Sequence, residues 1–173
     1  WCTLITKTLA PSDPLSKSDG ALRALDDELG DLRDHHTWDE EHPKEFQEVV
    51  RTEPFAHIAR IFPILGIKNW EDFEKRKFKA RVVLSGNLVK TAMGQWAIFQ
   101  EIGAIPSTMS GCRCILVLFC LIPNAKLLQS DCIRAYVQAP MKGTKTYIRL
   151  PKAWWPKHWA GMYRDPVCEL LQA

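Results

Sequence analysis

The hydrophobic period of residues 78–84 most strongly constrains the fold. Apolar side chains occupy every second position of "FKARVVL", at Phe78, Ala80, Val82 and Leu84. This alternation predicts a β-strand with those four residues on one face. Lys79 and Arg81 then share the opposite face with Val83, so the strand is predicted to present basic side chains on the side away from its apolar contacts.

The region before this strand has a helical period instead. Its leucines recur at steps of three and four residues, at Leu22, Leu25, Leu29 and Leu32. Such a stripe predicts an amphipathic helix, with Ser18 or Asp19 near its cap. We expect this helix to dock against the main body, because two heptads are too few for a coiled coil.

Other segments give weaker signals. Residues 55–67 are apolar but contain Pro63 and Gly66, so they form either a strand or a short broken helix. The segment 106–122 predicts a helix that begins at Ser107 or Thr108 and ends before Pro123. Short strands are predicted over 126–131 and 144–151, the second with its inward residues at Thr146, Ile148 and Leu150.

Charge is distributed very unevenly. Residues 1–74 hold 16 acidic and 8 basic residues, a net charge of −8, whereas residues 75–173 hold 4 acidic and 15 basic residues, a net charge of +11. This asymmetry points to a polyanion as partner for the second part, although a solvated basic surface would have the same composition.

The cysteine pattern and the apolar runs indicate in which cellular environment the protein is expected. The six cysteines match no zinc spacing and no signal peptide precedes them, which predicts reduced thiols in an intracellular protein. The run "ILVLFCLI" is far shorter than the ~20 residues that span a bilayer, so we expect no membrane partner.

Asp131 is the first candidate for chemistry. It ends the predicted short strand "KLLQSD" in a half of the chain that has only four acidic residues. A carboxylate at the end of a buried strand, among basic groups, suits a Mg²⁺ ion that also binds phosphate oxygens. The alternative is an aspartate that caps the turn after the strand.

Three further candidates lie before and after Asp131 in the sequence. Five bases, Lys75, Arg76, Lys77, Lys79 and Arg81, lead into and lie along the predicted strand, where they either bind phosphates or protect an exposed edge with charge. Tyr136 either packs beneath a sugar ring or belongs to the core. The tryptophans at 154, 155 and 159 either stack on bases or form an aromatic core cluster.

The histidines are weaker candidates. His35, His36 and His42 lie among acidic residues but lack a metal-ligand spacing such as His-Glu-x-x-His. We therefore do not predict a metal site at these histidines.

In order and spacing, several of these segments resemble the reverse transcriptase of copia-type LTR retrotransposons. "KFKARVVLSGN" resembles the family's Lys-Ala-Arg-Leu-Val-x-x-Gly strand of the fingers, and "LLQSDCIRAYVQAPMKGTKTYIRLPKAWWP" resembles its first palm motif. "DPVCELLQA" resembles the Val-Cys-x-Leu-x-x-Ala segment, and "ALRALDDELGDLRDHHTWDE" the opening helix and Thr-Trp. Residues 91–125 match poorly, and Cys132 and Arg134 replace the usual companions of the aspartate.

The resemblance implies roles for individual residues. Asp131 falls on the first metal-binding aspartate, Tyr136 on the aromatic steric gate, and Arg81 and Lys79 on the bases that hold the incoming nucleotide. The partners implied are an RNA template, a DNA primer, deoxynucleoside triphosphates and the rest of a Pol polyprotein, with its RNase H and integrase. Mg²⁺, or Mn²⁺ in its place, would be the cofactor.

The residue patterns predict an α+β fold, and the resemblance implies that it is part of a right-hand polymerase. We expect a flexible lead-in over residues 1–20, a helical arm and connection over 21–60, and fingers with a partial palm over 61–173. Both ends suggest a cut chain, and the Tyr-x-Asp-Asp loop does not occur in it. We therefore expect the fragment alone to be inactive. The alternative is a non-enzymatic nucleic-acid-binding module or a decayed retroelement relic.

Overall fold

The computed structural model describes residues 5–97, 108–128 and 135–172 of the 173-residue chain. These residues form a seven-stranded sheet and three α-helices, which confirms a mixed fold of helices and strands. The strands are β1 (Lys7–Thr8), β2 (Lys44–Glu45), β3 (His57–Lys68), β4 (Lys77–Leu84), β5 (Lys90–Thr91), β6 (Thr146–Arg149) and β7 (Pro166–Glu169). The α-helices are α1 (Asp19–Asp34), α2 (Phe46–Thr52) and α3 (Met109–Leu121).

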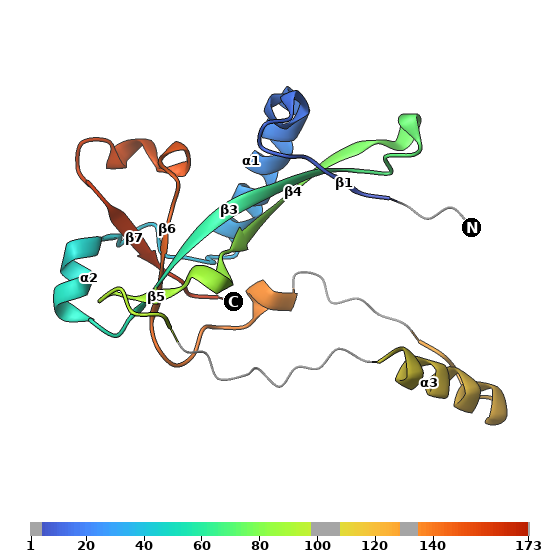
Figure 1. Cartoon of the computed structure of the whole chain (residues 1–173). Helices are drawn as coiled ribbons and strands as arrows, with labels where there is room; N and C mark the ends of the chain where they lie inside the picture. The colour runs from blue at the N-terminus through green and yellow to red at the C-terminus, as the bar shows by residue number, and fades with distance from the viewer. Residues whose placement is uncertain (1–4, 98–107, 129–134, 173) are drawn as a thin grey trace. The chain divides into compact units, whose positions relative to one another are not determined.

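The sheet is organised around the long strand β3 (Figure 1). Its path runs β1-β3-β6-β7-β2, and β4 and β5 also pair with β3. The pairing of β3 with β6 is parallel, and all other pairings among the described strands are antiparallel. The β3–β4 hairpin extends away from β6 and β7, so one sheet has a compact end and a projecting end.

Helix α1 covers one face of the hairpin. It begins after Ser18, whose hydroxyl accepts a hydrogen bond from the backbone N–H of Ala21, as the cap signal predicted. Gly20 is needed at the contact, because a Cβ there would lie 2.6 Å from the Phe78 ring. The core on this face is a single cluster of buried residues: Leu29, Trp38, Ala59, Ile61, Val89, Ile148, Leu150, Trp159 and Cys168.

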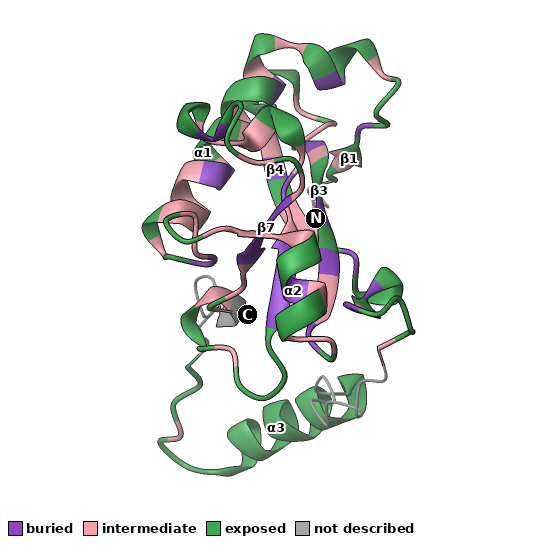
Figure 2. Ribbon diagram, turned by 90° about the vertical axis from the view of Figure 1, so that its left-hand side faces the viewer, coloured by how far each residue is buried: buried purple, intermediate pink, exposed green. Residues whose placement is uncertain are grey.

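Helix α2 covers the other face, but only at the compact end of the sheet. Its Val49 packs in a second buried cluster with Ala56, Ala92, Tyr147 and Val167. Figure 2 shows the buried residues concentrated on the central strands, with α2 lying beside them. The two faces of the sheet are therefore covered to different extents.

Strand β3 is continuous despite Pro63 and Gly66, which resolves the ambiguity of residues 55–67 in favour of a strand. The backbone groups of successive residues in a strand point to opposite edges, so residues two positions apart share an edge. The carbonyl of Leu65 accepts a hydrogen bond from Leu9 on the edge away from β4, so Pro63 also faces that edge. No described strand pairs with Pro63 there, and its missing N–H therefore costs no ladder bond.

Strand β6 and the segment after it agree with the sequence pattern. Thr146, Ile148 and Leu150 are all buried, as predicted, and Tyr147 between them is buried as well, because helix α2 covers its face. Trp159 is 1% exposed and belongs to the core beside α1, so the core interpretation of this tryptophan is confirmed. The indole of Trp155 donates to the carbonyl of Leu150 at 3.0 Å.

The chain divides into two compact units, residues 1–97 with 136–173, and residues 98–135. In the second unit, α3 begins after Thr108, whose hydroxyl accepts from Gly111 N–H at 3.1 Å, and ends before Pro123, as predicted. The short strand predicted over 126–131 is not found in its described part, since residues 126–128 have no regular structure. No helix among the described residues is long and apolar enough to cross a bilayer.

Candidate functional site

In the unit formed by residues 5–97 and 136–172, neither α1 nor α2 packs on one face of the β3–β4 hairpin. In the antiparallel register, Ile64 lies opposite Arg81, and Gly66 lies opposite Lys79. Paired residues point to the same face of a sheet. This face, called the open face below, therefore carries the side chains of Arg60, Phe62, Ile64, Lys68, Lys77, Lys79, Arg81 and Val83. The predicted grouping of Lys79, Arg81 and Val83 is confirmed.

The charge of the open face is entirely positive. Residues 57–68 and 77–84 contain no aspartate or glutamate. Within the described part of the chain, none of its five bases (Arg60, Lys68, Lys77, Lys79 and Arg81) forms an ion pair. These cations repel one another at close range, and an anion from another molecule would relieve that repulsion.

Apolar side chains lie between the bases. Phe62 is 44% exposed and Ile64 is 39% exposed, in the middle of an eight-residue hairpin ladder. Both sit on strand β3 beside the bases of strand β4. The surface thus combines positive charge with an aromatic platform, and sequence reasoning had found only its β4 half.

The predicted bases Lys75 and Arg76 lie in the connection between the strands, and they differ from those of the open face. Lys75 forms an ion pair with Asp72 at 2.9 Å, and this hydrogen bond raises the pKa of Lys75 and lowers the pKa of Asp72. Arg76 donates to the carbonyl of Trp70 at 2.8 Å and lies over the Trp70 ring, 4.0 Å from its centroid. Both side chains already have partners, whereas Lys77 belongs to the open face.

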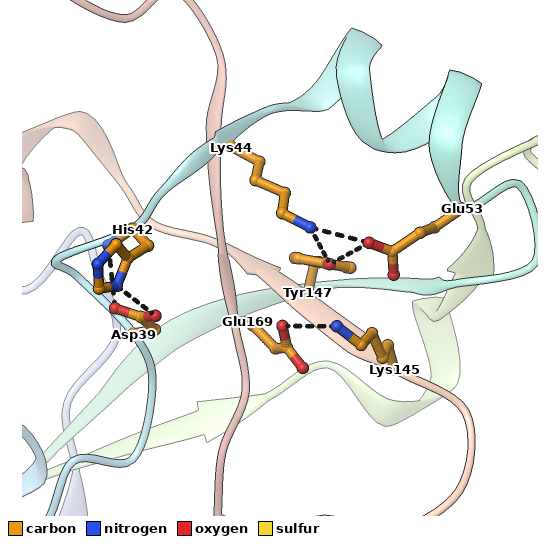
Figure 3. A network of polar contacts seen from close by, with 7 residues as sticks. All are labelled: Asp39, His42, Lys44, Glu53, Lys145, Tyr147 and Glu169. Carbon is orange, nitrogen blue, oxygen red and sulfur yellow. Dashed lines mark hydrogen bonds and ion pairs between the residues drawn. The ribbon is translucent and has the colours of Figure 1, made fainter.

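The compact end of the same sheet face holds a paired polar network (Figure 3). The Tyr147 hydroxyl donates to Glu53 at 2.8 Å and accepts from Lys44 at 3.1 Å, and Lys44 also contacts Glu53 at 2.8 Å. The bond from Lys44 lowers the pKa of Glu53, and the bond to Glu53 raises the pKa of Lys44. Burial raises the pKa of Tyr147, so the phenol keeps its proton.

Two more ion pairs complete this end. Lys145 contacts Glu169 at 3.1 Å, and Arg149 contacts Asp165 at 2.7 Å. Asp165 and Glu169 are the two acidic residues that follow Asp131 in the sequence. Both serve in structural ion pairs here, which gives them a role that the sequence did not reveal.

A cavity of about 570 Å³ lies beside the loop after α1. His36, His42 and His158 line it with Asp39 and Glu40. Both carboxylates already have partners: Asp39 accepts from His42 at 3.1 Å, and Glu40 accepts from Arg33 at 3.0 Å and Trp38 at 2.7 Å. Burial raises the pKa of Asp39, but the bonds from His42 and Glu41 outweigh it and the net shift is downward.

Asp131 and the side chain of Tyr136 lie outside the described residues, and only the backbone of Tyr136, in the 3₁₀ helix Ala135–Gln138, is placed. Their predicted roles therefore stay predictions. Among the described residues, no group of three His, Cys, Asp or Glu side chains is arranged to hold a metal ion.

Comparison of the chain with protein-family models, with curated proteins and with solved structures found no match. The open face and the sequence motifs are the features of this chain that bear on its function.

Proposed function

We propose that this chain is the fingers and first palm segment of an RNA-directed DNA polymerase, and that the open face of its β3–β4 hairpin binds nucleic acid. The observation that carries the proposal is a set of five bases that form no ion pair within the described residues, on a hairpin face where neither α1 nor α2 packs and whose two strands contain no acidic residue. A phosphate backbone supplies the regularly spaced anions that such a row of cations needs.

The exposed apolar residues favour a single strand over a duplex. The bases of a single strand are accessible and stack on aromatic rings, whereas those of a duplex are stacked on one another. Phe62, flanked by Ile64 and by the bases of β4, offers one such ring. The polymerase template ahead of the primer is a single strand of this kind.

The sequence motifs add the enzymatic part of the proposal. By resemblance, Arg81 and Lys79 hold the phosphates of the incoming nucleotide, and both lie on the open face. In the complete enzyme Asp131 would be one ligand of Mg²⁺, which supplies charge stabilisation at phosphoryl oxygens. A single carboxylate does not complete a two-metal site, so the 173 residues alone are expected not to extend a primer.

A non-enzymatic nucleic-acid-binding module, or a relic of an element, would use the same open face. The two hypotheses differ in what accompanies the chain. A Tyr-x-Asp-Asp sequence in the adjoining reading frame, with primer extension by the longer protein, would favour the polymerase. A longer protein that binds a primer–template but does not extend it would favour the module.

The binding proposal is tested by the fluorescence anisotropy of labelled single-stranded RNA over a range of salt. We expect the affinity to fall steeply with salt, and the triple variant Lys77→Gln, Lys79→Gln, Arg81→Gln to bind at least about tenfold more weakly. Its salt slope should be smaller by about 2, at ~0.7 for each lost phosphate contact.

The matched control is Lys142→Gln, Lys152→Gln, Lys157→Gln, which removes the same charge from exposed positions elsewhere. It should bind nearly as well as the unmodified chain. Equal losses in the two triple variants would mean that net charge alone drives binding, and the proposed site would then be wrong.

A further inference from the structure

The short segment of residues 5–9 is bonded to the tip of the hairpin. The carbonyl of Ile5 accepts from Trp70 N–H at 3.0 Å, and the Ile5 N–H donates to both carboxylate oxygens of Glu71, at 3.0 and 3.1 Å. Further along, Leu9 N–H donates to the carbonyl of Leu65 at 2.9 Å. The segment thus contacts the hairpin on both sides of β1, which pairs with Gly66 and Ile67 (Figure 1).

The packing at β1 is close. A Cβ at position 66 would lie 3.0 Å from the carbonyl oxygen of Lys7, so glycine at this position lets the two backbones approach. The contact explains why Gly66 is tolerated within strand β3. It also makes the fit of β1 specific to this place on β3.

Trp70 is held by cations from two different segments. The Lys7 ammonium lies 4.0 Å from the centroid of the ring, and the Arg76 guanidinium lies 4.0 Å from the same centroid. Arg76 comes from the end of the connection that leads into β4, and Lys7 comes from β1. The indole therefore joins residues 5–9 to the residue that directly precedes Lys77.

We propose that residues 5–9 act as a strap that positions the tip of the hairpin, and so orders Lys68 and Lys77 on the open face for binding. The effect of the strap on binding rests on the proposed nucleic-acid binding. The ordering of the hairpin tip by residues 5–9 does not depend on that proposal. Lys7 is a positioning residue in this proposal and no phosphate ligand, because it pairs with Ile67, which faces α1 and is 4% exposed.

The test uses the double variant Lys7→Ala, Glu71→Ala of the full chain, which leaves the net charge unchanged. The first measurement is amide hydrogen exchange over residues 66–77 without nucleic acid. We expect exchange about tenfold faster there, since a cation–π contact and two bonds to a carboxylate are lost. Exchange in β6, residues 146–149, should be unchanged.

The second measurement is the affinity for single-stranded RNA. We expect it to fall about threefold with an unchanged salt slope, because the strap supplies order and no base of the open face is removed. The control Lys17→Ala, Asp27→Ala is also charge-neutral, lies outside the hairpin and should change neither quantity. Lys7→Arg keeps a cation over Trp70 and should exchange like the unmodified chain.

Unchanged exchange over residues 66–77 in the double variant would overturn the strap. Faster exchange with unchanged affinity would overturn its role in binding. If the proposed function is wrong, the unmodified chain will bind no RNA. The hydrogen-exchange measurement would still decide whether residues 5–9 order the hairpin tip.

Discussion

The two ends of one sheet face differ in whether their basic side chains have acidic partners. At the compact end, Lys44, Lys145 and Arg149 each have a carboxylate within 3.1 Å. On the open face of the hairpin, five bases have no such partner among the described residues. Each of the three bases at the compact end has an acidic partner, whereas the two strands of the open face contain no acidic residue, and this difference distinguishes a structural region from a candidate binding surface.

The difference in pairing follows the difference in cover. Helix α2 packs over the compact end, where it shields Tyr147 and brings Glu53 to the Lys44 ammonium. Charges that are partly removed from water need partners, and these three bases have them. Neither α1 nor α2 packs on this face of the hairpin, and its five bases have no carboxylate partner among the described residues.

The largest expected effect tests whether the compact end contributes more to the free energy of unfolding than the open face does. Tyr147→Ala should lower the free energy of unfolding by about 3–4 kcal/mol, because a side chain that is 1% exposed leaves a cavity and Glu53 loses a donor. Phe62→Ala, on the open face, should cost less than about 1 kcal/mol. Urea unfolding measures both, and similar losses in the two variants would remove the distinction between the ends.

The next prediction concerns the aromatic platform. Phe62→Ala should weaken binding of single-stranded RNA by about tenfold, within the ~1–3 kcal/mol that a stacked base contributes, and leave the salt slope unchanged. Phe55→Ala is the matched control, since Phe55 is even more exposed but lies in the turn before β3. A loss of affinity in the control alone, or in neither variant, would argue against stacking on Phe62.

Much of this fold could be predicted because the signals are local. The stripe of leucines and Ser18 define α1, the alternation in residues 78–84 defines one face of β4, and Thr108 and Pro123 bound α3. Each of these signals arises within a few residues of chain. The positions of Lys79 and Arg81 on one face followed from the same alternation.

The rest depends on contacts between distant segments. In the sequence, Pro63 and Gly66 are both unfavourable for a strand. The structure accommodates them because no described strand pairs with Pro63 at its edge and because the backbone of Lys7 comes close to Gly66. The partnership of Lys44, Glu53 and Tyr147 joins residues up to 103 positions apart and leaves no sequence motif. Phe62 was missed as part of the site for the same reason, since only the register with β4 places it beside the bases.

The smallest expected effect concerns the pH dependence of the paired end. The pKa of Glu53 is lowered in the folded chain, chiefly by the bond from Lys44, so its contribution to stability is complete above its ordinary value of 4.5 and is lost as the pH falls through the folded pKa. Glu53→Gln removes this contribution and should lower the free energy of unfolding by about 1 kcal/mol or less at pH 7.

The difference between the unmodified chain and Glu53→Gln should therefore be constant from pH 6 to 8 and shrink below about pH 4.5. Lys44 does not interfere, because its pKa is raised and its own contribution changes only in strongly alkaline solution. Urea unfolding at several pH values measures the difference. If the difference in free energy of unfolding grew as the pH fell, the Lys44–Glu53 pair would not stabilise the compact end. Paired and unpaired bases would then not differ in their contribution to stability.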